Sequence, residues 1–134
     1  MINDDISNKI SFLEQERKLI VIVQKQIQLL ISQVQELPRL EDKLSGIIVI
    51  EKVLLMFIRD KIFSLHPVFD MSRMRTALTM VSTAKKQIFQ PNFEVYNKKI
   101  FVQLKFLEVN LNRKLKKNES DISALKNRLN IRVA

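Results

Sequence analysis

Apolar residues recur at intervals of three and four along most of the chain. An α-helix has about 3.6 residues per turn, so this spacing collects them on one helical face. The pattern predicts amphipathic helices at residues 4–37, 40–65, 70–89 and 93–131, and a proline lies in each gap between them. We therefore predict an all-α fold, a helical bundle or hairpin of three to four long helices that form a single domain over residues 1–134.

The composition agrees with few, long elements. The chain has one glycine and three prolines, whereas hairpins, sandwiches and barrels need many turn residues with positive φ. Hydrophobic residues make up 46% of the chain and charged residues 28%, which is the balance of a globular protein. The helix at residues 40–65 has apolar residues around much of its circumference, so we expect it to be the most buried one.

Residues 93–106 allow two interpretations. Apolar residues at every second position over residues 100–106 fit a strand, and the strand would belong to a hairpin that turns at Asn97 and Lys98. The same stretch also contains a helical face, made of Phe93, Tyr96, Ile100, Leu104 and Leu107. Because that face continues as far as residue 129, we favour one long, coiled-coil-like C-terminal helix.

The last part of that helix carries an apolar stripe with one polar member. Its residues, here named the C-terminal seam, are Leu111, Leu115, Asn118, Ile122, Leu125 and Leu129. This spacing is typical of a face that packs against another helix, so we expect the seam to bind a partner protein or a second copy of the chain. Asn118 either fixes the register of the paired helices or begins a break with a new helix cap at residues 118–121.

The composition excludes several kinds of chemistry. Without cysteine the chain has no disulfide, no thiolate nucleophile and no cysteine-type zinc site. One glycine is too few for the common phosphate-binding loops, and one histidine leaves little for Ser-His-Asp catalysis. We expect no cofactor and no metal ion, and a non-enzymatic role is favoured.

The sequence also bears on location. The most apolar stretch, residues 47–58, is interrupted by Glu51 and Lys52 and is shorter than the roughly 20 residues of a membrane-spanning helix. The N-terminus has Asp4 and Asp5 where a secretory signal has basic residues. We expect no membrane span and a cytoplasmic location.

Positive charge is concentrated in the second half of the chain. The formal net charge is +9; residues 1–66 contain 9 basic and 9 acidic residues, whereas residues 67–134 contain 14 and 5. The candidate nucleic-acid-binding side chains, all in the last part of the chain, are Arg113, Lys114, Lys116, Lys117, Lys126, Arg128 and Arg132. Clustered Lys and Arg bind nucleic-acid phosphates without a sequence code. The alternatives are a solvated helix flank and a surface that meets an acidic protein.

One short motif has residue types suited to catalysis. Arg59 is followed directly by Asp60 and then, after five more residues, by His66. The motif resembles the Arg-x4-6-His signature of HEPN domains, which are all-helical bundles of about this length. The resemblance implies metal-independent RNA cleavage, usually in a dimer, in which Arg59 holds the scissile phosphate, Asp60 orients the pair and His66 transfers a proton. Without catalysis, the same histidine is favourable near a helix C-terminus because of the helix dipole.

These features lead to one favoured function and two alternatives. We predict a helical protein–protein interaction module, acting as an assembly subunit, an adaptor or an export-type chaperone in a homo-oligomer or hetero-complex. The long apolar faces exceed what so short a chain easily buries alone, which favours a partner. The alternatives are a basic nucleic-acid-binding helical protein, which depends on the basic side chains of the last helix, and a HEPN-like metal-independent ribonuclease, which depends on Arg59 and His66.

Overall fold

The computed structural model describes the backbone of residues 2–133 and the side chains of residues 4–131. Its elements are α1 (Ile2–Glu36), a 3-10 turn η1 (Leu37–Arg39), α2 (Lys43–Arg59), α3 (Lys61–Ser64), α4 (Met71–Lys86) and α5 (Phe93–Val133). The all-α prediction is confirmed, and the described residues contain no strand. The hairpin alternative at residues 93–106 is wrong, because this stretch is the start of the continuous helix α5.

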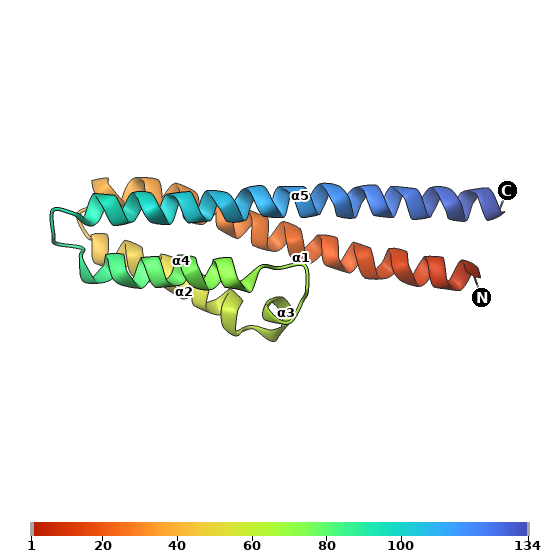
Figure 1. The fold of residues 1–134 in the computed structure, drawn as a ribbon, viewed down its shortest axis with the longest axis horizontal. Helices are drawn as coiled ribbons and strands as arrows, with labels where there is room; N and C mark the ends of the chain where they lie inside the picture. The colour runs from red at the N-terminus through yellow and green to blue at the C-terminus, as the bar shows by residue number, and fades with distance from the viewer. Residues whose placement is uncertain (1, 134) are drawn as a thin grey trace.

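The two long helices α1 and α5 lie antiparallel, so both ends of the chain lie at the same end of the molecule (Figure 1). Helices α2 and α4 lie beside them at the other end only. The connection between α3 and α4 contacts α1 at Phe12 and α5 at Lys114. Beyond those contacts, α1 and α5 continue as a two-helix stalk, residues 2–11 and 115–133, which projects from a four-helix body.

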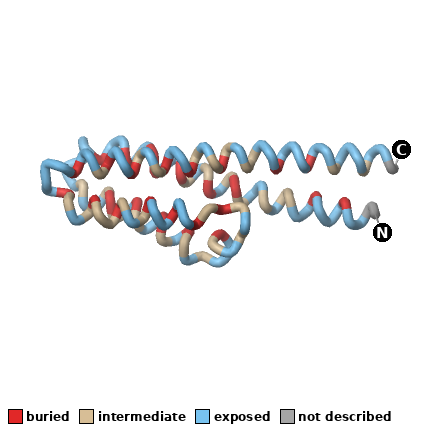
Figure 2. The backbone as a smooth tube through the Cα atoms, in the orientation of Figure 1, coloured by how far each residue is buried: buried red, intermediate tan, exposed pale blue. Residues whose placement is uncertain are grey.

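The core lies in the body and receives side chains from all four long helices (Figure 2). Its fully buried members include Ile27 of α1, Phe57 of α2, Met74 of α4 and Leu104 of α5. The expectation that residues 40–65 form the most buried helix is wrong. Only one face of α2 is buried, through Ile47, Ile50, Leu54 and Phe57, because its other side lies on the surface of the body.

The segment predicted as one helix over residues 40–65 is broken at Asp60. The backbone N–H of Asp60 donates to the Met56 carbonyl (2.9 Å) and closes α2, while its Oδ1 accepts from the N–H of Ile62 (2.9 Å) and opens α3. Aspartate favours such a cap because its short side chain competes for backbone N–H groups. The break turns the chain, and Ile62 and Leu65 become exposed.

Two further aspartates start helices. Asp70 Oδ1 accepts from the N–H of Arg73 (3.3 Å) and caps α4. Asp42 caps α2, accepting from the Ser45 hydroxyl (2.7 Å) and from the Ser45 N–H (3.0 Å). These hydrogen bonds favour the charged carboxylate and lower the pKa of Asp42. The cap therefore stabilises α2 above the pKa of a free aspartate and weakens as the pH falls through the lowered value.

The single glycine marks a close contact. A Cβ atom at Gly46 would lie 2.7 Å from Leu37 Cδ2 and 2.9 Å from Leu40 Cδ1. Leu37 is fully buried and has little room to move, whereas Leu40 is partly exposed. The first turn of α2 therefore lies against the chain that leads out of α1, and glycine is tolerated in a helix for that reason.

Candidate interaction surfaces

The C-terminal seam faces α1 of the same chain. Leu111, Asn118 and Ile122 are buried, and the other three members are half-buried. This revises the assignment of the seam to a partner, since its buried residues already have an intrachain neighbour and are not accessible in this structure. The helix contact predicted from the seam is present, but it is made within one chain.

Asn118 and a second asparagine, Asn97, lie on the buried side of α5. Asn118 Nδ2 donates to the carbonyl of Leu13 (2.9 Å), and Asn97 Nδ2 donates to the carbonyl of Val34 (3.0 Å). The two asparagines are 21 residues apart, and so are their two acceptors on the antiparallel helix α1. A shift of α5 along α1 would break both bonds, so the asparagines fix the register.

The alternative for Asn118, a break with a new cap, is wrong because α5 is continuous through residues 118–121. In both asparagines Oδ1 is buried and has no hydrogen-bond partner among the described residues. Asn97 was not singled out from the sequence, although its separation of three heptads from Asn118 was a usable signal.

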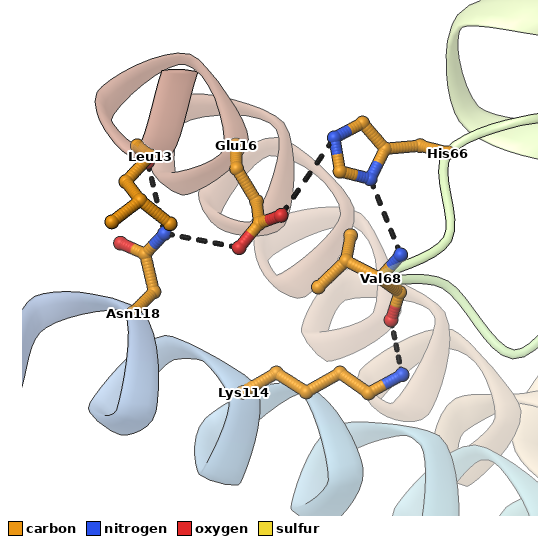
Figure 3. Close-up of polar contacts among 6 residues, drawn as sticks. All are labelled: Leu13, Glu16, His66, Val68, Lys114 and Asn118. Carbon is orange, nitrogen blue, oxygen red and sulfur yellow. Dashed lines mark hydrogen bonds and ion pairs between the residues drawn. The ribbon is translucent and has the colours of Figure 1, made fainter. Parts of the chain in front are cut away.

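A chain of polar contacts joins the stalk to the body (Figure 3). Glu16 Oε1 accepts from Asn118 Nδ2 (3.2 Å), and Glu16 Oε2 lies 3.9 Å from His66 Nε2. His66 Nδ1 accepts from the N–H of Val68 (3.2 Å), and Lys114 Nζ donates to the Val68 carbonyl. These contacts hold the connection between α3 and α4 against α1 and α5.

The three residues of the HEPN-like motif have separate surroundings. Arg59 is exposed at the last turn of α2, and Asp60 is the cap between α2 and α3. His66 stacks on Phe12 (ring centroids 6.0 Å apart), lies near Phe69 (5.9 Å) and faces Glu16. The motif histidine thus has a structural role in docking, and its part in RNA cleavage stays a prediction.

The ribonuclease hypothesis is best tested at Arg59, because His66→Ala would also remove contacts to α1. If the motif is catalytic, the protein should cleave single-stranded RNA in EDTA, and Arg59→Ala should reduce the rate by at least about 100-fold through loss of a phosphate contact. Its circular dichroism should not change, since Arg59 is exposed. Lys61→Ala, a nearby exposed cation, is the control. RNA left intact by wild-type protein would contradict the hypothesis.

The seven basic residues predicted to bind nucleic acid do not act as one set. Lys114 donates to Val68, and Lys126 Nζ pairs with Glu14 Oε1 (3.1 Å). The side chain of Arg132 lies outside the described side chains. Lys126 is exposed although it is paired, and the other exposed members are Arg113, Lys116, Lys117 and Arg128.

Three of the grooves formed by the described residues lie between two of the long helices. A groove of about 590 Å³ in the stalk is lined by Asn8, Lys9, Phe12, Leu13, Asp121, Ala124, Leu125 and Arg128. One of about 330 Å³ between α1 and α2 is lined by Leu29, Ser32, Gln33, Glu36, Leu40, Gly46 and Val49. A third, also about 330 Å³, lies between α4 and α5 and is lined by Met80, Val95, Lys98, Lys99, Val102 and Gln103.

Two exposed surfaces lie beside these grooves. Their exposed apolar side chains were not predicted as binding residues, whereas Arg113, Lys116 and Lys117 of the second surface belong to the predicted basic set. The α1–α2 face carries the exposed apolar side chains Ile22, Leu29, Leu40, Val49 and Met56. The α5 outer face, which points away from α1, carries Val95, Lys98, Lys99, Val102, Lys105, Phe106, Val109, Arg113, Lys116 and Lys117. The spacing of apolar residues predicted the buried stripe of each helix, but the exposed apolar stripe on the opposite side was not predicted.

The described residues provide no group of three or more His, Asp or Glu side chains placed to hold a metal ion. Among those residues, no helix is both long and apolar enough to cross a membrane. Comparison with known proteins gives no assignment, because no family model matches the chain and neither a curated protein nor a solved structure is significantly similar to it.

Proposed function

We propose that this protein is a helical interaction module that assembles with a second copy of itself through the α1–α2 face. The observation that carries the proposal is the set of apolar side chains that this face leaves in solvent, each 40–55% exposed. Single exposed apolar residues are ordinary on protein surfaces. A contiguous set beside a groove is instead typical of a protein–protein interface.

The exposed apolar side chains begin near η1 and continue along both α1 and α2. Leu29, Leu40 and Val49 line the groove between them. Ile22 and Met56 each lie seven residues farther along their helix, which is about two helical turns. They therefore extend the same side of each helix away from the groove, and the face offers apolar area on both helices.

Charge favours this face for self-association. The groove lining has one charged residue, Glu36, which lies 3.7 Å from Arg39 Nη1. In a two-fold symmetric dimer each face meets a copy of itself, so an excess of one charge would repel. Because the chain has a net charge of +9, its copies associate best through a surface with little excess lysine and arginine, and the groove lining contains neither residue. The exposed Lys25 and Lys52 lie between the apolar residues that extend the face beyond the groove, so the groove is its least positively charged part.

The test is the solution mass of a charge substitution in the groove. Wild-type protein should approach twice the monomer mass at about 100 μM, a concentration suited to a micromolar dissociation constant. Leu29→Asp places an unpaired charge in the contact and should weaken association by at least about 100-fold, giving monomer in sedimentation or light scattering.

A matched control separates interface loss from unfolding. Leu65→Asp is the same substitution at a side chain that is 75% exposed and outside the face, so it should keep the wild-type mass. Both variants should retain the wild-type circular dichroism spectrum. A monomeric wild-type protein, or a Leu29→Asp variant that still dimerises, contradicts the proposal.

A further inference from the structure

The α5 outer face combines apolar and basic side chains. Val95, Val102, Phe106 and Val109 are 54%, 46%, 50% and 44% exposed. Their separations of seven, four and three residues place them in one line along the helix. α5 thus has two apolar stripes on opposite sides, one buried on α1 and one in solvent. Figure 2 shows the corresponding alternation of buried and exposed positions along α5.

Basic side chains flank the exposed stripe on both sides. Helical spacing places Lys98 and Lys105 along one edge and Lys99 and Lys117 along the other. Arg113 and Lys116 continue the face beyond Val109. Lys105 pairs with Glu108 (3.2 Å), and it is the only one of these six to have an ion pair among the described residues. The face therefore carries uncompensated positive charge.

We propose that the α5 outer face binds an acidic amphipathic helix of a partner protein. An apolar stripe edged by lysines is complementary to a helix whose leucines lie between two rows of glutamates, as in a coiled coil. The groove between α4 and α5, which includes Met80 and Val102, provides room for the side chains of such a helix. Methionine adapts readily to a partner surface.

The apolar stripe favours a protein helix over a nucleic acid. Proteins that bind single-stranded nucleic acid commonly combine a basic groove with several aromatic rings on which bases stack. Phe106 is the one aromatic member of the stripe, and Arg73 of α4 already lies over its ring, with the guanidinium carbon 5.5 Å from the centroid. The valines offer no ring on which a base could stack, and an apolar valine side chain makes no favourable contact with a charged phosphate. The same face does not suit self-association, because its positive charges would repel in a symmetric dimer.

This inference goes beyond the proposed self-association, since it concerns a different face and a different partner. The probe is a synthetic helical peptide of about three heptads with leucine at positions a and d and glutamate at e and g. It should bind the full-length protein at low salt, and binding should weaken as salt is raised. A peptide of the same pattern with lysine in place of glutamate should not bind.

Two variants test the two components of the face. Phe106→Ala should weaken peptide binding roughly 10- to 100-fold through lost apolar contact. The double variant Lys98→Glu/Lys117→Glu should weaken it at least about 10-fold and flatten its salt dependence. The matched controls are Phe89→Ala and Lys61→Glu. Phe89 is 87% exposed and outside the face, and Lys61 is in α3 on the opposite side of the body from α5 (Figure 1). Both should bind like wild type.

The possible outcomes separate the proposals. No binding of the acidic peptide at low salt overturns this inference, and so does equal loss in the control variants. Binding of unrelated single-stranded oligonucleotides that is lost in the charge variant but kept in Phe106→Ala assigns the face to nucleic acid instead. Solution mass, measured on the same variants, reports self-association independently. A variant that loses peptide binding but keeps the wild-type solution mass is therefore altered in the α5 outer face and not in self-association.

Discussion

Phe57→Ala is expected to lower the free energy of unfolding by about 3–5 kcal/mol, because it removes a large side chain from a fully buried site and leaves a cavity. The Phe57 ring meets Phe63 edge to face, with centroids 5.0 Å apart, and Phe63 in turn contacts Phe69 (6.0 Å). The substitution therefore also loosens the connection that holds α3 and α4 on the body.

Urea unfolding followed by circular dichroism measures this loss. The control is Phe89→Ala, the same substitution at a side chain that is 87% exposed, which should change stability by less than about 0.5 kcal/mol. Equal effects of the two substitutions would mean that α2 and α3 do not pack as described. Loss of the connection should also expose His66 and its contacts on α1, so proteolysis between α3 and α4 should become faster in Phe57→Ala.

Asn118→Asp is expected to destabilise the protein by about 3–5 kcal/mol, because it places a carboxylate at a site that is 2% exposed. The Asn118 amide donates to the Leu13 carbonyl and to Glu16. A carboxylate cannot donate either bond and would lie beside a second carboxylate. The two-helix stalk should unfold first, since there α1 and α5 have only each other as neighbours.

The pH dependence of this variant follows from the same contacts. Burial and Glu16 are expected to raise the pKa of the introduced carboxyl in the folded state. Because the folded-state pKa is raised, the free-energy cost of burying the charge is absent at low pH. This cost grows as the pH passes the unfolded pKa and is complete above the folded pKa. Asn127→Asp, at an exposed site on the same helix, is the control and should be nearly neutral. A loss of stability that does not depend on pH would contradict this account.

Asn118→Leu should behave differently from the aspartate variant. It removes the unpaired Oδ1 together with both hydrogen bonds and adds apolar contact in the C-terminal seam. Polar residues at such positions fix the pairing of helices at a cost in stability. The leucine variant should therefore keep more of the wild-type stability than the aspartate variant, while the register of α5 on α1 rests on Asn97 alone.

Local features of the sequence determined the helices and most of their ends. The spacing of apolar residues predicted four long helices, and the observed helices begin and end within a few residues of the predicted limits, apart from the second. The Asp70 cap depends on residues three apart, so the sequence shows it directly. The long C-terminal helix was favoured over the hairpin because its apolar period of 3.6 continued well past residue 106.

The tertiary structure decided which faces meet. Asn118 and Leu13 are 105 residues apart, and Asn97 and Val34 are 63 apart, so no local pattern shows that they are neighbours. The C-terminal seam was recognised as a helix-packing face, but an apolar stripe does not specify whether its partner is in the same chain. The break at Asp60 was missed because the apolar spacing continues across it. An aspartate there can lie inside a helix or cap a new one, and the outcome depends on one side-chain hydrogen bond.

The candidate surfaces depended on the tertiary structure even more strongly. Val102 and Leu104 belong to opposite stripes of one helix. The sequence placed Leu104 on the packing face, but only the packing of α1 and α4 shows that the stripe with Val102 remains in solvent. The charge of the chain could be counted from the sequence, yet the pairing of Lys126 with Glu14 and the engagement of Lys114 by Val68 could not. Secondary structure arises from contacts a few residues apart, which sequence periodicity records. Surfaces arise from what long-range packing leaves uncovered, and periodicity carries no record of that.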